Sequence, residues 1–140
     1  YILCKDEIKF LDKNIEKLAK LSTEFSVVSI VTNQPQIAMN KLSLEELECI
    51  NNYIIHYCRA KSLLIDTVVW CPHHPHKGYD SENKILKTDC FCRKPKPGML
   101  LQLAYERNID LKSSLFVGDS DVDEEASKSA GCSFINVLNL

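Results

Sequence analysis

Two hydrophobic periods alternate along this chain, one typical of helices and one typical of buried strands. Apolar residues at helical spacing, with Lys and Glu between them, predict amphipathic helices, and short β-branched runs predict strands. The helices are predicted at residues 10–22, 43–59, 97–107 and 121–130, and the strands at residues 25–31, 67–70, 115–117 and 134–138. Because strands and helices alternate through mostly short turns, we predict an α/β domain with a parallel sheet and helices on both faces.

The predicted helices have recognisable ends. Ser43 followed by Glu46 is a capping box, in which each side chain bonds the backbone N–H of the other residue. A Pro-Gly pair opens the third helix, and Gly131 stands at the end of the fourth. Residues 71–96 follow neither period and contain several prolines, which predicts a long loop. Such loops are uncommon in compact domains unless they are functional or tied down.

Composition narrows the class of protein. The chain has 140 residues, 45% of them hydrophobic, which predicts a single domain over residues 1–140. Its net charge is −2 and it has no basic stripe, which disfavours nucleic acid as a partner. No apolar stretch approaches the roughly 20 residues that cross a bilayer, and no signal-peptide pattern opens the chain. We therefore expect a cytoplasmic monomer that binds a small molecule and neither nucleic acid nor membrane.

The cysteines of the predicted loop indicate a metal site. Cys71 and His73, and after a gap of 16 residues Cys90 and Cys92, supply three thiolates and one imidazole. This donor set suits tetrahedral zinc in a closed, structural site. Four bonds to one ion would also hold together the two ends of a loop that has no core of its own.

Other interpretations of these residues stay open. His74 and His76 are rival ligands, and we prefer His73 because both pairs then have alternate-residue spacing. Alternatively, the cysteines are small buried residues beside surface histidines, although such paired spacings seldom arise by chance. The remaining cysteines are expected to be core residues of helices and strands; they are Cys4, Cys49, Cys58 and Cys132.

A second set of polar residues lies where a parallel sheet binds ligands, beyond the carboxyl ends of its strands. Thr32 and Asn33 end one strand and can offer a hydroxyl and backbone N–H groups to a phosphoryl oxygen. Arg93 and Lys94 precede a helix, whose amino end favours anions. Asp119 follows another strand, where a carboxylate can hold Mg²⁺ against a phosphate.

Each of these signals has an ordinary explanation when it is taken alone. A strand-ending turn explains the Thr-Asn pair, and a solvated surface explains the two cations. Helix capping by Asp119 or Ser120 explains the acidic group. The combination of all three, in this order along one chain, is what indicates a phosphate site.

Four strings of sequence make the chain resemble the haloacid dehalogenase (HAD) superfamily. They are Val31-Thr32-Asn33-Gln34, Cys71-Pro72-His73-His74-Pro75, Cys90-Phe91-Cys92-Arg93-Lys94-Pro95-Lys96-Pro97-Gly98-Met99-Leu100 and Val117-Gly118-Asp119. The similarity runs from about Ile8 to Val137 and is close for the zinc-binding branch that contains heptose bisphosphate and histidinol-phosphate phosphatases. The resemblance implies a HAD-like Rossmannoid three-layer sandwich with a parallel sheet, a zinc-bound loop and no large cap domain.

The resemblance also implies an activity. The chain would be a Mg²⁺-dependent phosphomonoesterase that hydrolyses a small phosphorylated metabolite, above all a sugar (heptose) phosphate, through an aspartyl-phosphate intermediate. Thr32 would orient the phosphoryl oxygens, Lys94 would offset their charge, and Asp119 would hold the catalytic Mg²⁺. The implied substrate contacts and the supporting magnesium ligand are Asn33, Arg93 and Asp123.

The chain departs from the family pattern at the nucleophile. The family's Asp-x-Asp motif, which carries the nucleophile and the acid/base, belongs on a strand before the first predicted helix and is absent from this chain. Asp6 and Asp12 cannot replace it, because they flank a helix start and do not end an apolar strand. We expect the missing strand to be supplied by another segment, and the 140-residue chain alone to be inactive. Without that strand, its two neighbours would have unpaired edges about 9–10 Å apart, at roughly 4.8 Å per strand step, and the domain should be unstable.

The chain also departs from the family pattern at the substrate. Relatives usually have an Arg that touches substrate where this chain has Met39, which cannot bind a second phosphate. One competing function is therefore a catalytically inactive, zinc-stabilised domain that binds a partner or is a remnant. The missing motif favours it, and the surviving Thr32, Lys94 and Asp119 oppose it. A zinc module that binds nucleic acid is disfavoured by the charge balance.

Overall fold

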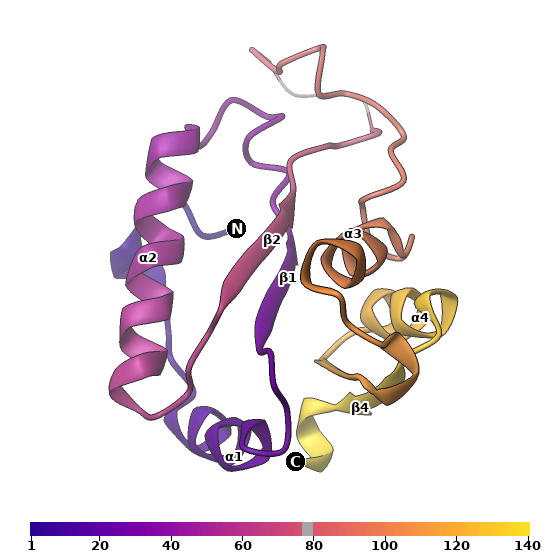
Figure 1. The fold of residues 1–140 in the computed structure, drawn as a ribbon. Helices are drawn as coiled ribbons and strands as arrows, with labels where there is room; N and C mark the ends of the chain where they lie inside the picture. The colour runs from indigo at the N-terminus through magenta and orange to yellow at the C-terminus, as the bar shows by residue number, and fades with distance from the viewer. Residues whose placement is uncertain (77–79) are drawn as a thin grey trace.

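All the predicted helices and strands occur in the computed structural model, which describes residues 1–76 and 80–140 (Figure 1). The α-helices are α1 (Asp12–Ser22), α2 (Leu44–Ala60), α3 (Gly98–Arg107) and α4 (Asp121–Ala130). The strands are β1 (Ser29–Asn33), β2 (Thr67–Cys71), β3 (Leu115–Gly118) and β4 (Ser133–Asn136), and the short 3₁₀ helices are η1 (Lys5–Glu7), η2 (Leu111–Ser113) and η3 (Val137–Asn139).

The predicted helix ends are confirmed by their hydrogen bonds. The Ser43 hydroxyl accepts from the Glu46 N–H at 3.2 Å, and the Glu46 carboxylate accepts from the Ser43 N–H at 2.8 Å. Gly131 ends α4 in the left-handed conformation, with φ of 83°, where a side chain would be strained. Both ends depend on local sequence, which is why the pattern predicted them.

Two strand boundaries differ from those that the apolar pattern predicts: β1 begins later and β4 ends earlier. β1 starts at Ser29 and not at Phe25, because its partner β2 starts at Thr67 and the ladder begins with that pair. β4 ends at Asn136, because its partner β3 ends at Gly118 and the Asn136 side chain then caps η3. Pairing, and not apolar content, sets these boundaries.

The sheet is interrupted at its centre. β1 pairs in parallel with β2, and β3 pairs in parallel with β4, as two separate pairs. This interruption agrees with the expectation that, without the family's first strand, its two neighbours have unpaired edges; these are the edges of β1 and β3.

Helices cover both sides of the strands and complete three layers (Figure 1). α1 and α2 pack on one side of the β1–β2 pair, around a core of Ile15, Ala19, Cys58, Leu63 and Ile65. A second core is formed by α2 and the segment that follows β1, and it consists of Ile37, Leu42, Leu47 and Ile50. α3 contacts β2 and α4, and α4 contacts β3 and β4, so the helices after the long loop cover the other side.

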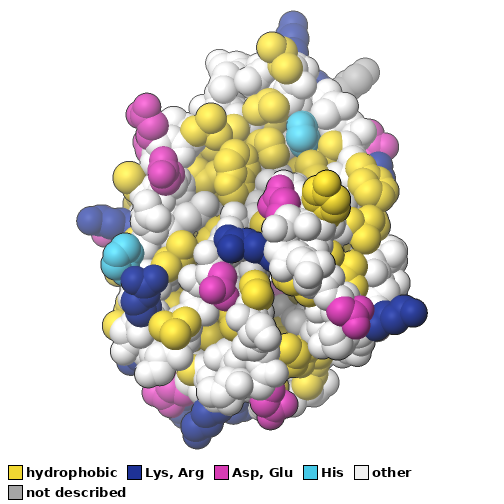
Figure 2. Space-filling view, in the orientation of Figure 1, with side chains coloured by type: hydrophobic (Ala, Val, Ile, Leu, Met, Phe, Trp, Pro, Cys, Tyr) yellow, Lys and Arg dark blue, Asp and Glu magenta, His cyan; other side chains and the backbone are white. Residues whose placement is uncertain are grey.

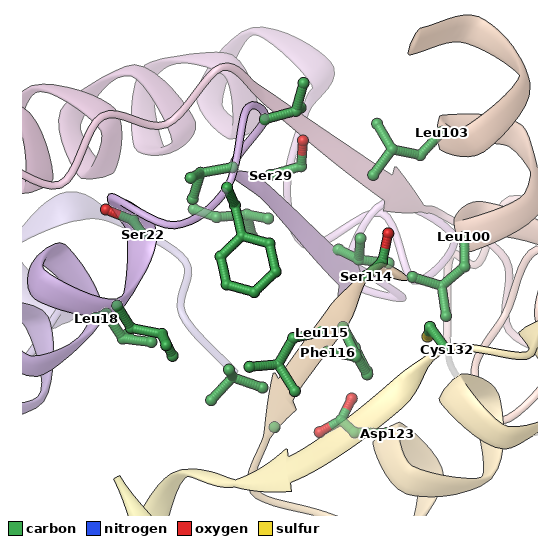
Figure 3. Close-up of a pocket in the computed structure, with 18 of the residues that line it drawn as sticks. Leu18, Ser22, Ser29, Leu100, Leu103, Ser114, Leu115, Phe116, Asp123 and Cys132 are labelled. Carbon is green, nitrogen blue, oxygen red and sulfur yellow. The ribbon is translucent and has the colours of Figure 1, made fainter. Parts of the chain in front are cut away.

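An apolar cavity of about 550 Å³ separates β1 from β3 (Figure 3). Its walls include Ile30 and Val31 of β1 and Leu115 and Phe116 of β3, together with residues of α1 and α3. Lys94 lines it together with the acidic residues Asp119 and Asp123. The cavity thus lies between the unpaired edges of two parallel strands.

Two of the cysteines expected in the core are on the surface. Cys58 is buried and Cys132 is half-buried, but Cys4 and Cys49 are exposed. Cys49 lies on α2, where the buried face is formed by other residues. Among the described residues, none of the helices has the length and apolar character needed to cross a bilayer.

Candidate active site and metal centre

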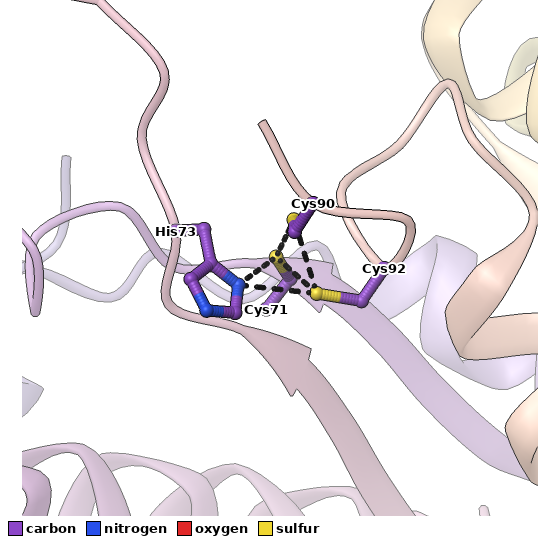
Figure 4. A group of neighbouring side chains, drawn as sticks. All are labelled: Cys71, His73, Cys90 and Cys92. Atoms are coloured by element: carbon purple, nitrogen blue, oxygen red, sulfur yellow. Dashed lines mark hydrogen bonds between the residues drawn. The ribbon is translucent and has the colours of Figure 1, made fainter. Parts of the chain in front are cut away.

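The four residues predicted as zinc ligands form one cluster (Figure 4). Cys71 ends β2, His73 follows it, and Cys90 and Cys92 approach from the far end of the long loop. One ligand atom from each residue lies within 4.8 Å of all the others. Cys71 is fully buried, and the other three side chains are half-buried.

The spacing of these atoms fits a tetrahedral ion. The Cys71 sulfur lies 3.5 Å from that of Cys90 and 2.9 Å from that of Cys92, and His73 Nδ1 lies 3.2 Å from the Cys92 sulfur. Zinc–sulfur bonds of about 2.3 Å would place the sulfurs about 3.8 Å apart. A zinc ion therefore needs the sulfurs to separate by less than an ångström, with His73 binding through Nδ1.

The rival histidines have other contacts. His74 is buried, and its Nδ1 accepts from the backbone N–H of His76 at 3.1 Å. Burial lowers the pKa of His74, which favours its neutral form. The His76 side chain is exposed and packs edge-on against the His74 ring. The geometry therefore favours His73 as the fourth member of the cluster.

Thiol acidity differs within the cluster. Burial, with the neighbouring Cys92, raises the pKa of Cys71. Burial also opposes ionisation of Cys90, but hydrogen bonds from Cys92, Cys71 and the Arg93 N–H outweigh it, and the pKa of Cys90 is lowered. The hydrogen bonds that Cys90 accepts thus favour its thiolate.

Lys94 is a buried cation held between β1, β3 and α4. Its ammonium donates to the Val31 carbonyl at 3.0 Å and to Asp123 Oδ1 at 2.5 Å, and it lies 5.6 Å from the centre of the Phe116 ring. Only 12% of the Lys94 side chain and 8% of the Asp123 side chain are exposed. The predicted phosphate-binding cation thus lies at the carboxyl ends of the strands, paired with a carboxylate.

Both carboxylate oxygens of Asp123 accept hydrogen bonds. Its Oδ2 accepts from the Ser120 hydroxyl at 2.7 Å and from the Asp119 N–H at 3.4 Å. Burial alone would raise the pKa of Asp123, but the hydrogen bonds from Lys94 and Ser120 and the charge of Lys94 outweigh it, so the pKa is lowered. A Cβ on Gly118 would lie 2.5 Å from the Asp123 Cβ, so only glycine permits this packing.

The other predicted site residues lie around this pair. Asp119 is exposed just after β3, and Thr32 is half-buried at the end of β1, one residue beyond the carbonyl that binds Lys94. The Arg93 side chain points toward the Cys/His cluster, where its guanidinium donates to the His73 carbonyl at 3.1 Å. The structure therefore brings Thr32, Lys94 and the Asp119 backbone to one end of the strands, while Arg93 supports the Cys/His cluster.

Sequence reasoning missed two features of this site. One is the Lys94–Asp123 pair, although Asp123 was singled out as an acidic position. The other is the bonding between the side chain of Asn33, which was predicted as a substrate contact, and the backbone of Lys94. A buried Lys paired with an acid on another element leaves no local pattern, so neither was predictable. Met39 is buried in the core, with 2% of its surface exposed.

Charges of both signs are interspersed over the face shown in Figure 2, and no basic stripe crosses it. This agrees with the net charge of −2.

Comparison with known proteins links this arrangement to sugar phosphatases. The HAD-hydrolase-like family matches residues 91–139. Over 126 residues the chain is 36% identical to D-glycero-beta-D-manno-heptose-1,7-bisphosphate 7-phosphatase of Pasteurella multocida, covering 89% of this chain and 65% of the relative. The enzyme of the same name from Pseudomonas aeruginosa is 35% identical over 132 residues, covering 94% and 68%. The chain thus spans about two thirds of the length of these curated relatives.

Solved structures have the same fold. A D,D-heptose 1,7-bisphosphate phosphatase from B. bronchiseptica, complexed with magnesium and phosphate, matches with a TM-score of 0.78 and 28% identity, covering 96% of this chain and 69% of that one. A putative HAD-like phosphatase from Mesorhizobium loti matches with a TM-score of 0.81 and 29% identity, covering 91% and 59%. The predicted HAD-like α/β fold is therefore confirmed.

Proposed function

Because this chain belongs to the HAD-like hydrolases, in the group of the heptose bisphosphate phosphatases, we propose that it is the greater part of a phosphomonoesterase for a small sugar phosphate. One observation carries the proposal: a buried lysine at the carboxyl ends of β1 and β3 bonds the carbonyl of Val31, the residue before Thr32, and lines the same cavity as Asp119. Ligands of parallel α/β sheets bind at this end of the strands. Burying a cation is costly, so its presence at this end of the strands favours an anionic ligand there.

The residues divide the work of binding a phosphoryl group. The Lys94 ammonium offsets negative charge on the transferring oxygens, and the Thr32 hydroxyl donates a hydrogen bond to one of them. Both are held by β1, which makes their positions independent of substrate. Asp123 holds the Lys94 ammonium in place.

Magnesium fits one of the two carboxylates proposed for it. Asp119 is exposed at the end of β3 and can offer an oxygen to Mg²⁺, which prefers carboxylate, phosphate and water oxygens. Both oxygens of Asp123 already accept hydrogen bonds, so Asp123 suits an anchoring role better than direct metal binding. When bound, Mg²⁺ would neutralise charge on the phosphate.

The strand that carries the nucleophile is proposed to occupy the cavity between β1 and β3. A parallel strand placed there would pair with both unpaired edges, bury apolar side chains on both faces and join the two pairs into one sheet. Its carboxyl end would meet Lys94, so an acidic residue at that end would lie beside the phosphate site. The family's Asp-x-Asp strand has these properties.

The proposed reaction has two steps, transfer of the phosphoryl group to a carboxylate and its hydrolysis by water. A carboxylate oxygen of the strand attacks phosphorus and forms a P–O bond, while the bond to the sugar oxygen breaks and the second carboxyl group protonates that oxygen. Water then attacks phosphorus and gives its proton back to the second carboxylate. This releases phosphate and restores the nucleophile.

Zinc is the metal proposed for the Cys/His cluster. Three thiols and one imidazole are a zinc donor set. Four protein ligands would leave no coordination position for water, so the site would be structural. When bound, zinc would tie the end of β2 to the segment that carries Lys94. The single-domain organisation, the monomeric state and the cytoplasmic location remain predictions.

The test is a phosphatase assay of the protein expressed from the start of its gene. We expect release of phosphate from sugar phosphates, including heptose phosphates, in the presence of Mg²⁺. Asp119→Ala should abolish this release, and the 140-residue chain alone should be inactive. Activity from the 140-residue chain alone would contradict the proposal for the nucleophile. Inactivity of a protein that does carry the Asp-x-Asp strand would favour the partner-binding function instead.

A further inference from the structure

We infer that Asn33 is a positioning residue that sets the place of Lys94 and does not contact the substrate; this inference rests on the proposed function. The amide side chain of Asn33 and the backbone of Lys94 form two hydrogen bonds. The Lys94 N–H donates to Asn33 Oδ1 at 3.0 Å, and Asn33 Nδ2 donates to the Lys94 carbonyl at 3.2 Å. Both functional atoms of the Asn33 amide are therefore already in use.

This pair joins a rigid strand to an irregular segment. Asn33 is the last residue of β1, and its backbone is in register with Cys71 of β2. Lys94 lies between β2 and α3, where the chain is neither helix nor strand. A residue in such a segment takes its position from tertiary contacts, because it has no ladder or helix of its own.

Asn33 and the Cys/His cluster hold the same segment from the same rung of the β1–β2 ladder. Cys71 contacts Cys90 and Cys92, while its register partner Asn33 bonds Lys94, two residues beyond Cys92. The cluster fixes the chain before Lys94, and the amide pair fixes Lys94 itself. Loss of Asn33 would therefore displace Lys94 while the metal site stays intact.

The ammonium depends on this backbone placement. Lys94 must reach the Val31 carbonyl and Asp123 together, and both partners are fixed by β1 and α4. Displacement of a catalytic charge by about 1 Å can lower turnover about 100-fold. An altered Lys94 position should thus lower kcat, whereas loss of a substrate contact made equally in ground state and transition state would raise KM.

The experiment compares Asn33→Leu, which removes both hydrogen bonds at similar size, with Asn33→Asp, which keeps the acceptor for the Lys94 N–H. Asn52→Leu, at an exposed asparagine of α2, is the control. In the protein expressed from its gene start, three quantities are measured: the bound metal, the hydrogen exchange of the Lys94 N–H by NMR, and kcat and KM.

For Asn33→Leu we expect unchanged metal content, Lys94 N–H exchange accelerated at least about tenfold, and kcat lowered about 10- to 100-fold with little change in KM. Asn33→Asp should retain the Lys94 N–H protection. A raised KM with unchanged kcat, or exchange equal to that of the wild type, would overturn the inference. If the wild-type protein has no activity, the proposed function fails, and the exchange measurement alone decides the role of Asn33. If Asn33→Leu does not fold, faster Lys94 N–H exchange in Asn33→Asp than in wild type would overturn the inference.

Discussion

Replacing Asp123 by Asn should lower the free energy of unfolding more than the corresponding amide substitution of any other acidic residue in α4. The substitution keeps the shape of the side chain against Gly118 but removes the negative charge that faces the Lys94 ammonium. Lys94 then stays buried, with 12% of its side chain exposed, beside a neutral amide. A buried cation without its counter-charge is strongly unfavourable.

The size of the effect follows from burial. Removing one partner of a buried pair typically lowers the free energy of unfolding by about 3–5 kcal/mol. Lys94 keeps its hydrogen bond to the Val31 carbonyl and its position over the Phe116 ring, so we expect the lower end, about 3 kcal/mol. This is a large part of the about 5–15 kcal/mol that stabilises a typical domain.

The adjacent carboxylate on the same helix is the matched control. Glu124 pairs with Lys128 one turn away, but 43% and 69% of these side chains are exposed. Glu124→Gln should therefore lower the free energy of unfolding by only about 0.3–0.5 kcal/mol. Urea unfolding of the wild-type protein and both variants measures the difference. If Asp123→Asn lost no more than Glu124→Gln, the Lys94–Asp123 pair would not be a stabilising element and the reasoning would be refuted.

The pH dependence of this difference has a definite sign. The pKa of Asp123 is lowered in the folded protein, so its contribution is fully present above the unfolded pKa of about 3.9. It is lost as the pH falls through the lower, folded pKa. The gap in stability between wild type and Asp123→Asn should therefore be constant from about pH 5 to pH 8 and should narrow below about pH 4. A gap that instead grew at acid pH would contradict the direction of the shift.

Two further predictions concern the segment that carries Lys94. Metal analysis should find one equivalent of zinc in the wild type and none in Cys90→Ser, whose unfolding temperature should also fall, because structural zinc contributes about 10 kcal/mol or more to folding. The exposed Cys49→Ser is the control, and a wild type without zinc or a Cys90→Ser variant with unchanged zinc would contradict the site. Gly98→Ala should lower the free energy of unfolding by about 1–3 kcal/mol, because its Cβ would lie 2.4 Å from the Phe91 carbonyl oxygen. A urea unfolding curve that matches the wild type would show that the backbone can shift there without cost.

Local sequence was sufficient for the elements and for the metal cluster. The capping box of Ser43 and Glu46, the end of α4 at Gly131 and the bounds of α4 depend on residues within one helical turn. The Cys/His cluster was also predictable, because the spacing of its residues and their chemistry leave few other uses. The helix ends follow from contacts between neighbours in sequence, whereas the cluster joins two short motifs about 20 residues apart and was predicted from their donor chemistry.

The placement of Lys94 was decided by tertiary structure alone. Its partners Asn33, Val31 and Asp123 come from β1 and α4, and the separation in sequence is 61, 63 and 29 residues. No local pattern distinguishes a lysine that will be buried and paired from one that will be solvated. The sequence identified Lys94 through the string it shares with a family, and only the fold shows how it is held.

The division of the sheet has the same origin. Apolar, β-branched composition determined that residues near 29–33 and 115–118 would be strands, but strand pairing depends on what lies beside each edge in space. β1 and β3 each have a partner on one side and the apolar cavity on the other. Composition therefore determined the strands of this protein, while three-dimensional packing decided where the sheet is interrupted, because backbone hydrogen bonds form only between edges that the fold brings together.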